Sequence, residues 1–308
     1  VHYRDARTAG MIEKSGDFID KNEFYDITGN QFMELNTAFQ LLSLKLDRPD
    51  LLDRTETMLL TPDLLGYFLT GIKRAEYSIA STTQLMDARG HCWSDKVINA
   101  LGLPKRIFPE IIPSGTKLGP ILPEITKELG LDSADVIAIC GHDTQDALVS
   151  VPASEKDFIF ISCGTWSLFG TELDAPIIND ESYKLNVTNE GGFGGKTSFL
   201  KNIIGLWLIQ ESRRQWIREG KEYSFGELEK MAKNEKAFRC FIDPDAPEFV
   251  PAGNIPERIR EYCRRTGQSV PENEAQIVRC IDESLAFKYR DSLAEIEVCT
   301  GKDYHTIY

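Results

Sequence analysis

The sequence has no apolar run long enough to cross a membrane. The stretch from residue 203 to residue 209 is typical, and it falls far short of the roughly 20 residues that a spanning helix needs. No charged segment followed by an apolar segment at the amino end resembles a secretory signal. We therefore expect a cytoplasmic protein with no membrane partner.

The seven cysteines include no CxxC pair. Cys140 and Cys163 lie in apolar segments, which is typical of reduced thiols that pack as small core residues. Cys263 and Cys280 flank a connection between two helical patterns, so their side chains could approach one another. A reducing compartment disfavours a structural disulfide, and the sequence leaves this pairing open.

Positive charge is also scarce. There are 35 basic and 48 acidic residues, which gives a net charge of −13. Such a surface repels phosphate backbones, so nucleic acid is a poor candidate partner, although a few local donors or a metal could still hold a nucleotide. The length of 308 residues suits two domains, and the segment 152–157 predicts the boundary between domains at residues 1–152 and 153–308.

The stretch 135–150 is the most informative in the chain. Residues 136–140 are apolar and rich in β-branched side chains, which predicts a strand buried on both faces. Helical spacing resumes after Gly141, with Asp143 or Thr144 suited to cap the helix. Asp143 would then lie where open α/β sheets bind ligands, a suitable place for a catalytic carboxylate. Taken alone, Asp143 could equally be only a helix cap.

Two apolar runs, 158–162 and 165–172, predict strands joined by a tight turn at Cys163-Gly164. The donors of such a turn can bind phosphate oxygens, although alone a plain turn is the better interpretation. Residues 189–197 end in Gly-Lys-Thr like a P-loop, but that motif needs a glycine where Glu190 stands. We predict a glycine-rich hairpin instead.

A strong helical pattern covers residues 202–220, with Asn202 as its cap. Asn202 and Gln210 would lie on one helix face and could line a crevice, although a cap and a surface glutamine explain them more simply. Further predicted helices cover 20–29, 35–46, 61–71, 94–101, 104–111, 224–234, 254–267 and 272–301, and a strand is predicted at 238–242.

Together, the motifs of the chain resemble those of the FGGY family of carbohydrate kinases over essentially the whole length. They are Tyr3-Arg4-Asp5 with Arg7-Thr8, Asn36-Thr37, Pro62-Asp63 with Leu69-Thr70-Gly71, Ala80-Ser81-Thr82-Thr83-Gln84-Leu85, Gly141-His142-Asp143-Thr144, Ser162-Cys163-Gly164-Thr165-Trp166-Ser167, Thr188-Asn189-Glu190-Gly191-Gly192, and Leu200-Lys201-Asn202 with Gly205-Leu206-Trp207-Leu208. The last two are the most discriminating.

This resemblance implies an α/β protein of two ribonuclease-H-like domains of the actin and hexokinase type, with an interdomain cleft. Residues 1–152 would belong to the sugar-binding domain and 153–308 to the ATP-binding domain. The implied reaction transfers the γ-phosphoryl group of ATP, with Mg²⁺, to the 1-hydroxyl of L-rhamnulose. Its site residues would be Asp143 as the general base, with His142, Asp143, Thr144 and Asn202 on the sugar and Thr165 and Gln210 on ATP. No residue is assigned to a metal.

Two alternatives remain open at this point: another ketose such as fuculose or xylulose, and a noncatalytic sugar-binding protein of the same fold. The setting Gly-His-Asp-Thr argues against the second, because such a protein would lose the acid. The family's first phosphate-binding hairpin, with its Asp-x-Gly motif, would precede Val1, and its adenine loop would follow Tyr308. We therefore expect an internal portion of a longer protein that turns over negligibly alone. The oligomeric state is not predicted.

Overall fold

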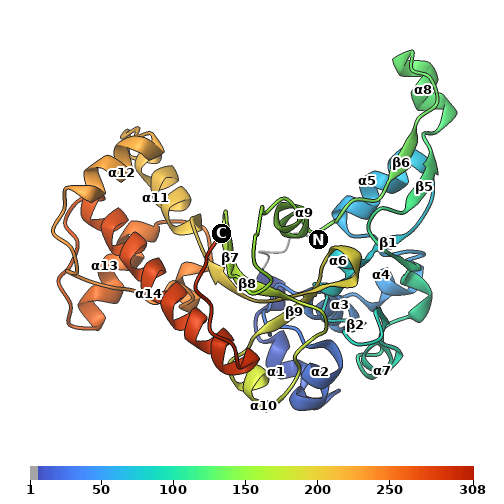
Figure 1. The fold of residues 1–308 in the computed structure, drawn as a ribbon, viewed down its shortest axis with the longest axis horizontal. Coiled ribbons are helices and arrows are strands. Elements are labelled where there is room, and N and C mark those ends of the chain that lie inside the picture. Colours follow the sequence, from blue (N-terminus) through green and yellow to red (C-terminus); the bar gives the residue numbers. More distant parts are fainter. Residues whose placement is uncertain (1–5) are drawn as a thin grey trace.

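The computed structural model describes residues 6–308, so the motif at Tyr3-Arg4-Asp5 lies outside the described residues. An antiparallel sheet occupies the middle of the molecule, with the long carboxyl-terminal helices on one side and the amino-terminal helices on the other (Figure 1). A narrow arm projects from the amino-terminal half, with a short helix at its tip.

The central sheet has four strands: β7 (Phe160–Cys163), β8 (Trp166–Leu173), β9 (Thr188–Gly191) and β10 (Thr197–Ile204), in the order β7-β8-β10-β9. All its pairs are antiparallel, and both the predicted turn near Cys163-Gly164 and the glycine-rich hairpin before Thr197 are confirmed. Strands β8 and β10 approach closely at Gly170, where an added Cβ would lie 2.4 Å from Leu200 Cβ. A side chain there would force the strands apart.

The predicted helix at 202–220 is wrong at its start. Asn202 does not cap a helix but lies within β10, opposite Leu168 of β8. The strand ends at Ile204, and at the next residue, Gly205, an added Cβ would lie 2.4 Å from Ser167 Oγ. The helix begins only at Trp207. Pairing with β8 along all eight residues of β10 outweighs the local preference of asparagine for a helix start.

Four helices build the carboxyl-terminal side: α11 (Trp207–Arg218), α12 (Phe225–Lys233), α13 (Ile255–Arg265) and α14 (Glu274–Thr300). The last three match their predicted ranges to within two residues, because side chains cap their starts, as Ser224 does for α12 and Asn273 for α14. None of the described helices has both the length and the apolar character that crossing a bilayer requires.

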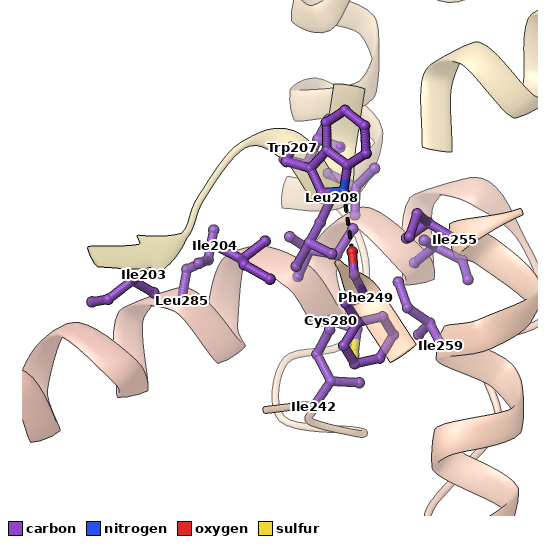
Figure 2. Close-up of a cluster of buried hydrophobic side chains, with 14 of the residues drawn as sticks. Ile203, Ile204, Trp207, Leu208, Ile242, Phe249, Ile255, Ile259, Cys280 and Leu285 are labelled. Carbon is purple, nitrogen blue, oxygen red and sulfur yellow. Dashed lines mark hydrogen bonds between the residues drawn. The ribbon is translucent and has the colours of Figure 1, made fainter. Parts of the chain in front are cut away.

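These helices cover the sheet through one large apolar core (Figure 2). Ile203 and Ile204 of β10 pack beside Leu285 of α14 and Trp207 of α11. The indole Nε1 of Trp207 donates to the carbonyl oxygen of Phe249 at 3.1 Å, so this large buried ring has its polar atom satisfied.

The strand predicted at 238–242 is absent. The segment is irregular, and side chains accept three of its backbone N–H groups, those of Phe238, Phe241 and Ile242. The amides of Phe238 and Ile242 donate to Glu283 and Ser284 of α14, at 2.8 and 3.0 Å. Cys240 and Ile242 therefore reach the core without a neighbouring strand, because α14 supplies acceptors that a strand would supply.

The amino-terminal half is mainly helical. Its helical elements are the 3₁₀ turn η1 (Ala6–Thr8), α1 (Met11–Ser15), α2 (Lys21–Thr28), α3 (Thr37–Asp47), α4 (Pro49–Arg54), α5 (Thr61–Thr70), α6 (Tyr77–Ser81) and α7 (Asp95–Ala100). Two short strand pairs accompany them: β1 (Ala75–Glu76) pairs with β4 (Ile111–Ile112), and β2 (Met86–Asp87) pairs with β3 (Cys92–Trp93). The helix predicted at 104–111 is reduced to one 3₁₀ turn, η2 (Lys105–Ile107), because β4 then pairs with β1. Three further short elements belong to the carboxyl-terminal half: α10 (Asp180–Lys184), η3 (Phe193–Gly195) and η4 (Pro247–Phe249).

The projecting arm consists of β5 (Lys117–Pro120), α8 (Pro123–Leu129) and β6 (Asp135–Ile137). The prediction of a strand at 136–140 buried on both faces is wrong, because β6 ends at Ile137 and pairs only with β5 among the described strands. Ile137 is 48% exposed and Ile139 67% exposed. A two-stranded ribbon has no further strands beside it that would bury its side chains, so an apolar run in the sequence does not by itself establish a buried strand.

Candidate active site

A cavity of about 500 Å³ lies where the start of α9 (Asp143–Val149), the β7–β8 turn and strands β9 and β10 meet the amino-terminal half. Five of the six predicted site residues line it: His142, Asp143, Thr144, Thr165 and Asn202. The sixth, Gln210, does not line the cavity. It instead lies behind Thr165, whose Oγ1 donates to Gln210 Oε1 at 3.4 Å.

Asp143 is the first residue of α9, so its predicted place at a helix start is confirmed. The predicted cap is not, because His142 is the N-cap residue and no side chain caps this helix. The Asp143 side chain is exposed, and it forms no hydrogen bond or ion pair with any residue between 6 and 308. Its carboxylate is therefore available to a molecule in the cavity.

The start of α9 is fixed by Glu76, a residue that is 3% exposed. Glu76 Oε2 accepts the backbone N–H of Gly141 at 2.7 Å, and the next amide, that of His142, donates to Ser78 Oγ at 3.1 Å. Ser78 Oγ in turn donates to Glu76 Oε2 at 2.5 Å. A buried carboxylate with several donors holds its position firmly, so Glu76 determines where Asp143 projects. Glu76 was not predicted as a site residue from the sequence, since no local pattern links residues 76 and 141.

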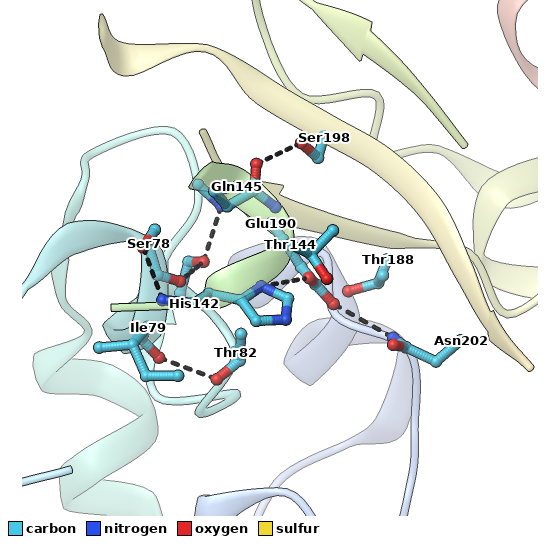
Figure 3. A network of polar contacts seen from close by, with 12 residues as sticks. Ser78, Ile79, Thr82, His142, Thr144, Gln145, Thr188, Glu190, Ser198 and Asn202 are labelled. Atoms are coloured by element: carbon cyan, nitrogen blue, oxygen red, sulfur yellow. Dashed lines mark hydrogen bonds and ion pairs between the residues drawn. The ribbon is translucent and has the colours of Figure 1, made fainter. Parts of the chain in front are cut away.

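A second acidic residue, Glu190 of β9, joins two of the predicted substrate residues (Figure 3). Its Oε2 lies 3.3 Å from His142 Nδ1, and its Oε1 accepts Asn202 Nδ2 at 3.1 Å. Burial alone would lower the pKa of His142, but the Glu190 carboxylate beside it, with smaller contributions from Asp143 and Glu76, raises this pKa above its ordinary value. Glu190 was noted in the sequence only as the residue that breaks a P-loop pattern, although it belongs to one of the discriminating motifs.

Two hydrogen bonds tie α9 to the central sheet. The hydroxyls of Thr144 and Ser162 of β7 lie 3.3 Å apart, and Ser198 Oγ of β10 donates to Gln145 Oε1 at 2.7 Å. Asp143 is therefore held at a fixed distance from the β7–β8 turn, which carries Thr165.

Amide side chains form the wall that comes from the amino-terminal half. Gln31 pairs with the backbone of Asn202, accepting its N–H at 2.9 Å and donating to its carbonyl oxygen at 3.3 Å. Asn30 donates to Thr188 Oγ1 at 3.2 Å, while its own buried Oδ1 has no hydrogen-bond partner within residues 6–308. The cavity thus offers carboxylates, amides and hydroxyls within one space, a donor and acceptor set that suits a molecule with several hydroxyl groups.

Comparison with known proteins agrees with this geometry. Residues 1–150 match the model of the amino-terminal domain of the FGGY family of carbohydrate kinases, and residues 159–308 match the model of its carboxyl-terminal domain. The chain belongs to the FGGY family of carbohydrate kinases. The family resemblance expected from the sequence motifs is thereby confirmed.

Several curated relatives of this FGGY chain carry the name rhamnulokinase. The chain is 41% identical over 306 residues to the rhamnulokinase of Bacteroides thetaiotaomicron and 40% identical over 308 residues to that of Oceanobacillus iheyensis. These alignments cover 99% and 100% of the chain but only 62% and 64% of the relatives' own lengths. The chain therefore spans under two thirds of the relatives that it matches.

Solved structures show the same fold. A ligand-bound xylulose kinase from Lactobacillus acidophilus superposes with a TM-score of 0.73 at 16% identity, covering 100% of this chain and 61% of that one. A glycerol kinase from Plasmodium falciparum, solved with ADP, gives a TM-score of 0.72 at 15% identity, with the same coverage. The expected two-domain kinase fold of mixed helix and sheet is confirmed.

Proposed function

We propose that the gene product containing this chain is a rhamnulokinase, which transfers the γ-phosphoryl group of ATP to the 1-hydroxyl of L-rhamnulose in the cytoplasm. Relatives at 40–41% identity carry that name, and residues from several of the motifs that resemble the family line one cavity. The observation that carries the proposal is the Asp143 carboxylate, which lines this cavity and has no partner among the described residues.

Asp143 acts as the general base in this proposal. As the sugar oxygen attacks phosphorus, the hydroxyl proton moves to the Asp143 carboxylate, a contribution of roughly 10²- to 10⁴-fold in rate. Phosphoryl transfer depends mainly on positioning and on stabilising charge. The support that Glu76 gives to the start of α9 therefore favours this role, because it keeps the base at one place in the cavity.

The sugar is held by the polar groups next to Asp143. The hydroxyl of Thr144 and the ring of His142 lie on one side, and the amide of Asn202 lies on another. Glu190 orients two of these three groups at once, so it fixes the hydrogen-bonding direction of both. Held in this way, the reacting hydroxyl meets the phosphorus in line, which makes the two bound reactants behave as one molecule.

In this proposal Thr165 contacts ATP, and Gln210, which does not line the cavity, supports Thr165 from behind. The β7–β8 turn offers backbone amides that can donate to phosphate oxygens, whereas the Thr165 hydroxyl donates its own proton to Gln210 Oε1. Mg²⁺, which neutralises phosphate charge when bound, usually takes one or two carboxylates together with the phosphates. Among the described residues, no three His, Cys, Asp or Glu side chains of the cavity lie close enough together to form a metal site by themselves.

The test compares Asp143→Asn with the unchanged gene product in an assay that couples ADP release to each of L-rhamnulose, L-fuculose and D-xylulose. L-Rhamnulose is expected to give the highest kcat/KM. The variant is expected to lose about 10²- to 10⁴-fold in kcat while its affinity for the sugar, measured by calorimetry, changes only a few-fold.

Asp146→Asn is the matched control, because Asp146 lies one turn later on the same helix and does not line the cavity. Unchanged turnover in Asp143→Asn would remove Asp143 from its role. A higher kcat/KM for fuculose or xylulose would leave the kinase proposal in place but change its sugar. Sugar binding without turnover of any of the three sugars by the gene product would favour the noncatalytic alternative.

A further inference from the structure

The base of the β7–β8 turn is held by a residue from a distant helix. Ser167 of β8 lies opposite Cys163 of β7, and these two form the last pair of strand residues before the turn. The hydroxyl oxygen of Tyr289, from α14, lies 2.6 Å from Ser167 Oγ and 3.9 Å from Cys163 Sγ. Tyr289 comes 122 positions after Ser167, so no local pattern in the sequence predicts this contact. The turn that the proposed function assigns to ATP is thus fixed at its base by a carboxyl-terminal helix.

The ring of Tyr289 is itself held in place. It stacks on Phe169 of β8, with ring centroids 5.8 Å apart and an angle of 12° between the ring planes. Burial raises the pKa of Tyr289 to about 12, so its hydroxyl keeps its proton at neutral pH. The hydroxyl is therefore available to Ser167 Oγ as a hydrogen-bond donor.

Ser167 has no room to turn to another partner. It is 0% exposed, and Gly205 packs directly against it, because a Cβ added at Gly205 would lie 2.4 Å from Ser167 Oγ and 2.7 Å from the Ser167 backbone nitrogen. Its only other partner among the described side chains is Cys163 Sγ at 3.6 Å, and a thiol is a weak donor and acceptor. Without the Tyr289 hydroxyl, the buried Ser167 hydroxyl would be poorly satisfied, and the end of β8 would shift to relieve this cost.

A second support determines the direction of the amides in the turn. The carbonyl oxygen of Gly164 accepts the N–H of Leu206 at 3.0 Å, and that of Thr165 accepts the N–H of Trp207 at 3.1 Å. In a planar trans peptide the C=O and N–H groups point in opposite directions, so the Thr165 N–H points away from the start of α11. Gly164 and Thr165 both line the cavity. A shift at the base of the turn would move this donor relative to a bound phosphate.

We propose that Tyr289 is a positioning residue for ATP, which keeps the phosphate-binding turn in place through Ser167. The inference rests on the proposed function, because it needs the turn to bind the phosphates of ATP. Tyr289 does not line the cavity, so it would act through the turn and not by contact with a reactant. A looser turn should weaken the binding of ATP and leave the binding of the sugar by residues of α9 and β10 unchanged.

Tyr289→Phe tests this role, because it removes the hydroxyl and keeps the ring that stacks on Phe169. In the whole gene product, we expect the Kd for MgATP, measured by calorimetry without sugar, to rise about 3- to 10-fold, as for the loss of one hydrogen bond. The Kd for L-rhamnulose should stay unchanged. In the coupled assay, the KM for ATP should rise by the same factor as its Kd, while the KM for L-rhamnulose does not change.

Two further variants sharpen the test. Ser167→Ala removes the other side of the same contact, so combining it with Tyr289→Phe should weaken ATP binding no more than either change alone. Tyr304→Phe is the matched control, because Tyr304 is also buried but its hydroxyl has no hydrogen-bond partner among residues 6–308. It should keep the affinities of the unchanged gene product for both ligands.

An unchanged affinity for ATP in Tyr289→Phe would overturn the proposal. So would an equal loss of affinity for ATP and L-rhamnulose, which would indicate a general loss of structure. If Tyr289→Phe fails to fold, Ser167→Ala decides the question by the same two criteria. A gene product that binds ATP but phosphorylates none of the three sugars would remove the proposed function, while its affinity for ATP would still decide the role of Tyr289. A gene product that binds no ATP would overturn both.

Discussion

Replacing Glu190 by glutamine tests the electrostatics of the candidate active site. The change keeps the shape of the side chain and the oxygen that accepts Asn202 Nδ2, but it removes the charge beside His142 Nδ1. His142 then loses the main group that raises its pKa, while burial, which lowers that pKa, remains. The pKa of His142 should therefore fall relative to the unchanged chain, even though Asp143 and Glu76 still act on it.

The sign of the effect on stability follows from the direction of this shift. A histidine whose pKa is raised in the folded state stabilises the fold below its ordinary pKa of 6.5, and that stabilisation is lost as the pH rises through the raised value. The pair is buried, with side chains only 17% and 5% exposed, so solvent screens it weakly. His142 Nδ1 and Glu190 Oε2 lie 3.3 Å apart without hydrogen-bonding geometry, so the contact is an ion pair. Removing one charge of a buried ion pair costs about 3–5 kcal/mol. Glu190→Gln should thus lower the free energy of unfolding by about that amount at pH 6 and by clearly less at pH 9.

Two measurements check this prediction. The chain has only four histidines, so their ring resonances can be followed by NMR across the titration, and urea unfolding gives the free energies at both pH values. Glu181→Gln is the matched control, because Glu181 pairs with Lys184 at the surface and should cost less than about 1 kcal/mol. An unchanged or higher pKa for His142 in Glu190→Gln, or a loss of stability that is the same at pH 6 and pH 9, would refute the reasoning.

Three further predictions concern the fold and the chain as a whole. Gly170→Ala should destabilise the chain by at least about 1–3 kcal/mol in urea unfolding, since the new Cβ meets the backbone of β10. The control Gly226→Ala, at an open position of α12, should cost no stability. Tyr25→Phe removes the 2.7 Å hydrogen bond to the carbonyl oxygen of Val187 and should lower the free energy of unfolding by about 0.5–1.5 kcal/mol in the same measurement. The control Tyr67→Phe, on the partly exposed helix α5, should leave that free energy unchanged. The chain of 308 residues should bind L-rhamnulose in calorimetry but give no measurable ADP release with ATP, and measurable turnover would contradict this.

Helices with strong end signals were predictable from the sequence. The capping box of Ser224 and Glu227 and the asparagine before α14 are local features, and both helices lie where these features place them. Strand pairing was predictable only where a tight turn enforces it, as at Cys163-Gly164. The segments 136–140 and 238–242 were both predicted as strands, yet Ile137 and Ile139 of the first are exposed, whereas Cys240 and Ile242 of the second reach the core without a strand. Their surroundings come from distant segments, which periodicity does not report.

The residues that organise the site were the hardest to predict for the same reason. Glu76 acts on an amide 65 residues away, and Glu190 lies 48 positions after His142, so neither contact leaves a local pattern. Neither residue has neighbours in the sequence that mark it as buried: Glu76 stands between Ala75 and Tyr77, and Glu190 between Asn189 and Gly191. In this chain, with its 48 acidic residues, such a setting does not separate a buried carboxylate from a solvated one.

The position of Asn202 within β10, rather than at the start of a helix, favours the proposal that this residue contacts the sugar. As a helix cap, its side chain would have been used on the backbone of its own helix. In β10, alternate residues point to opposite faces, so Ile203 enters the core while Asn202 lines the cavity. There its Nδ2 donates to Glu190, and its side-chain oxygen, which has no hydrogen-bond partner in the described part of the chain, can accept from a hydroxyl group. The strand therefore frees the amide that a cap would have occupied, and Glu190 determines its orientation.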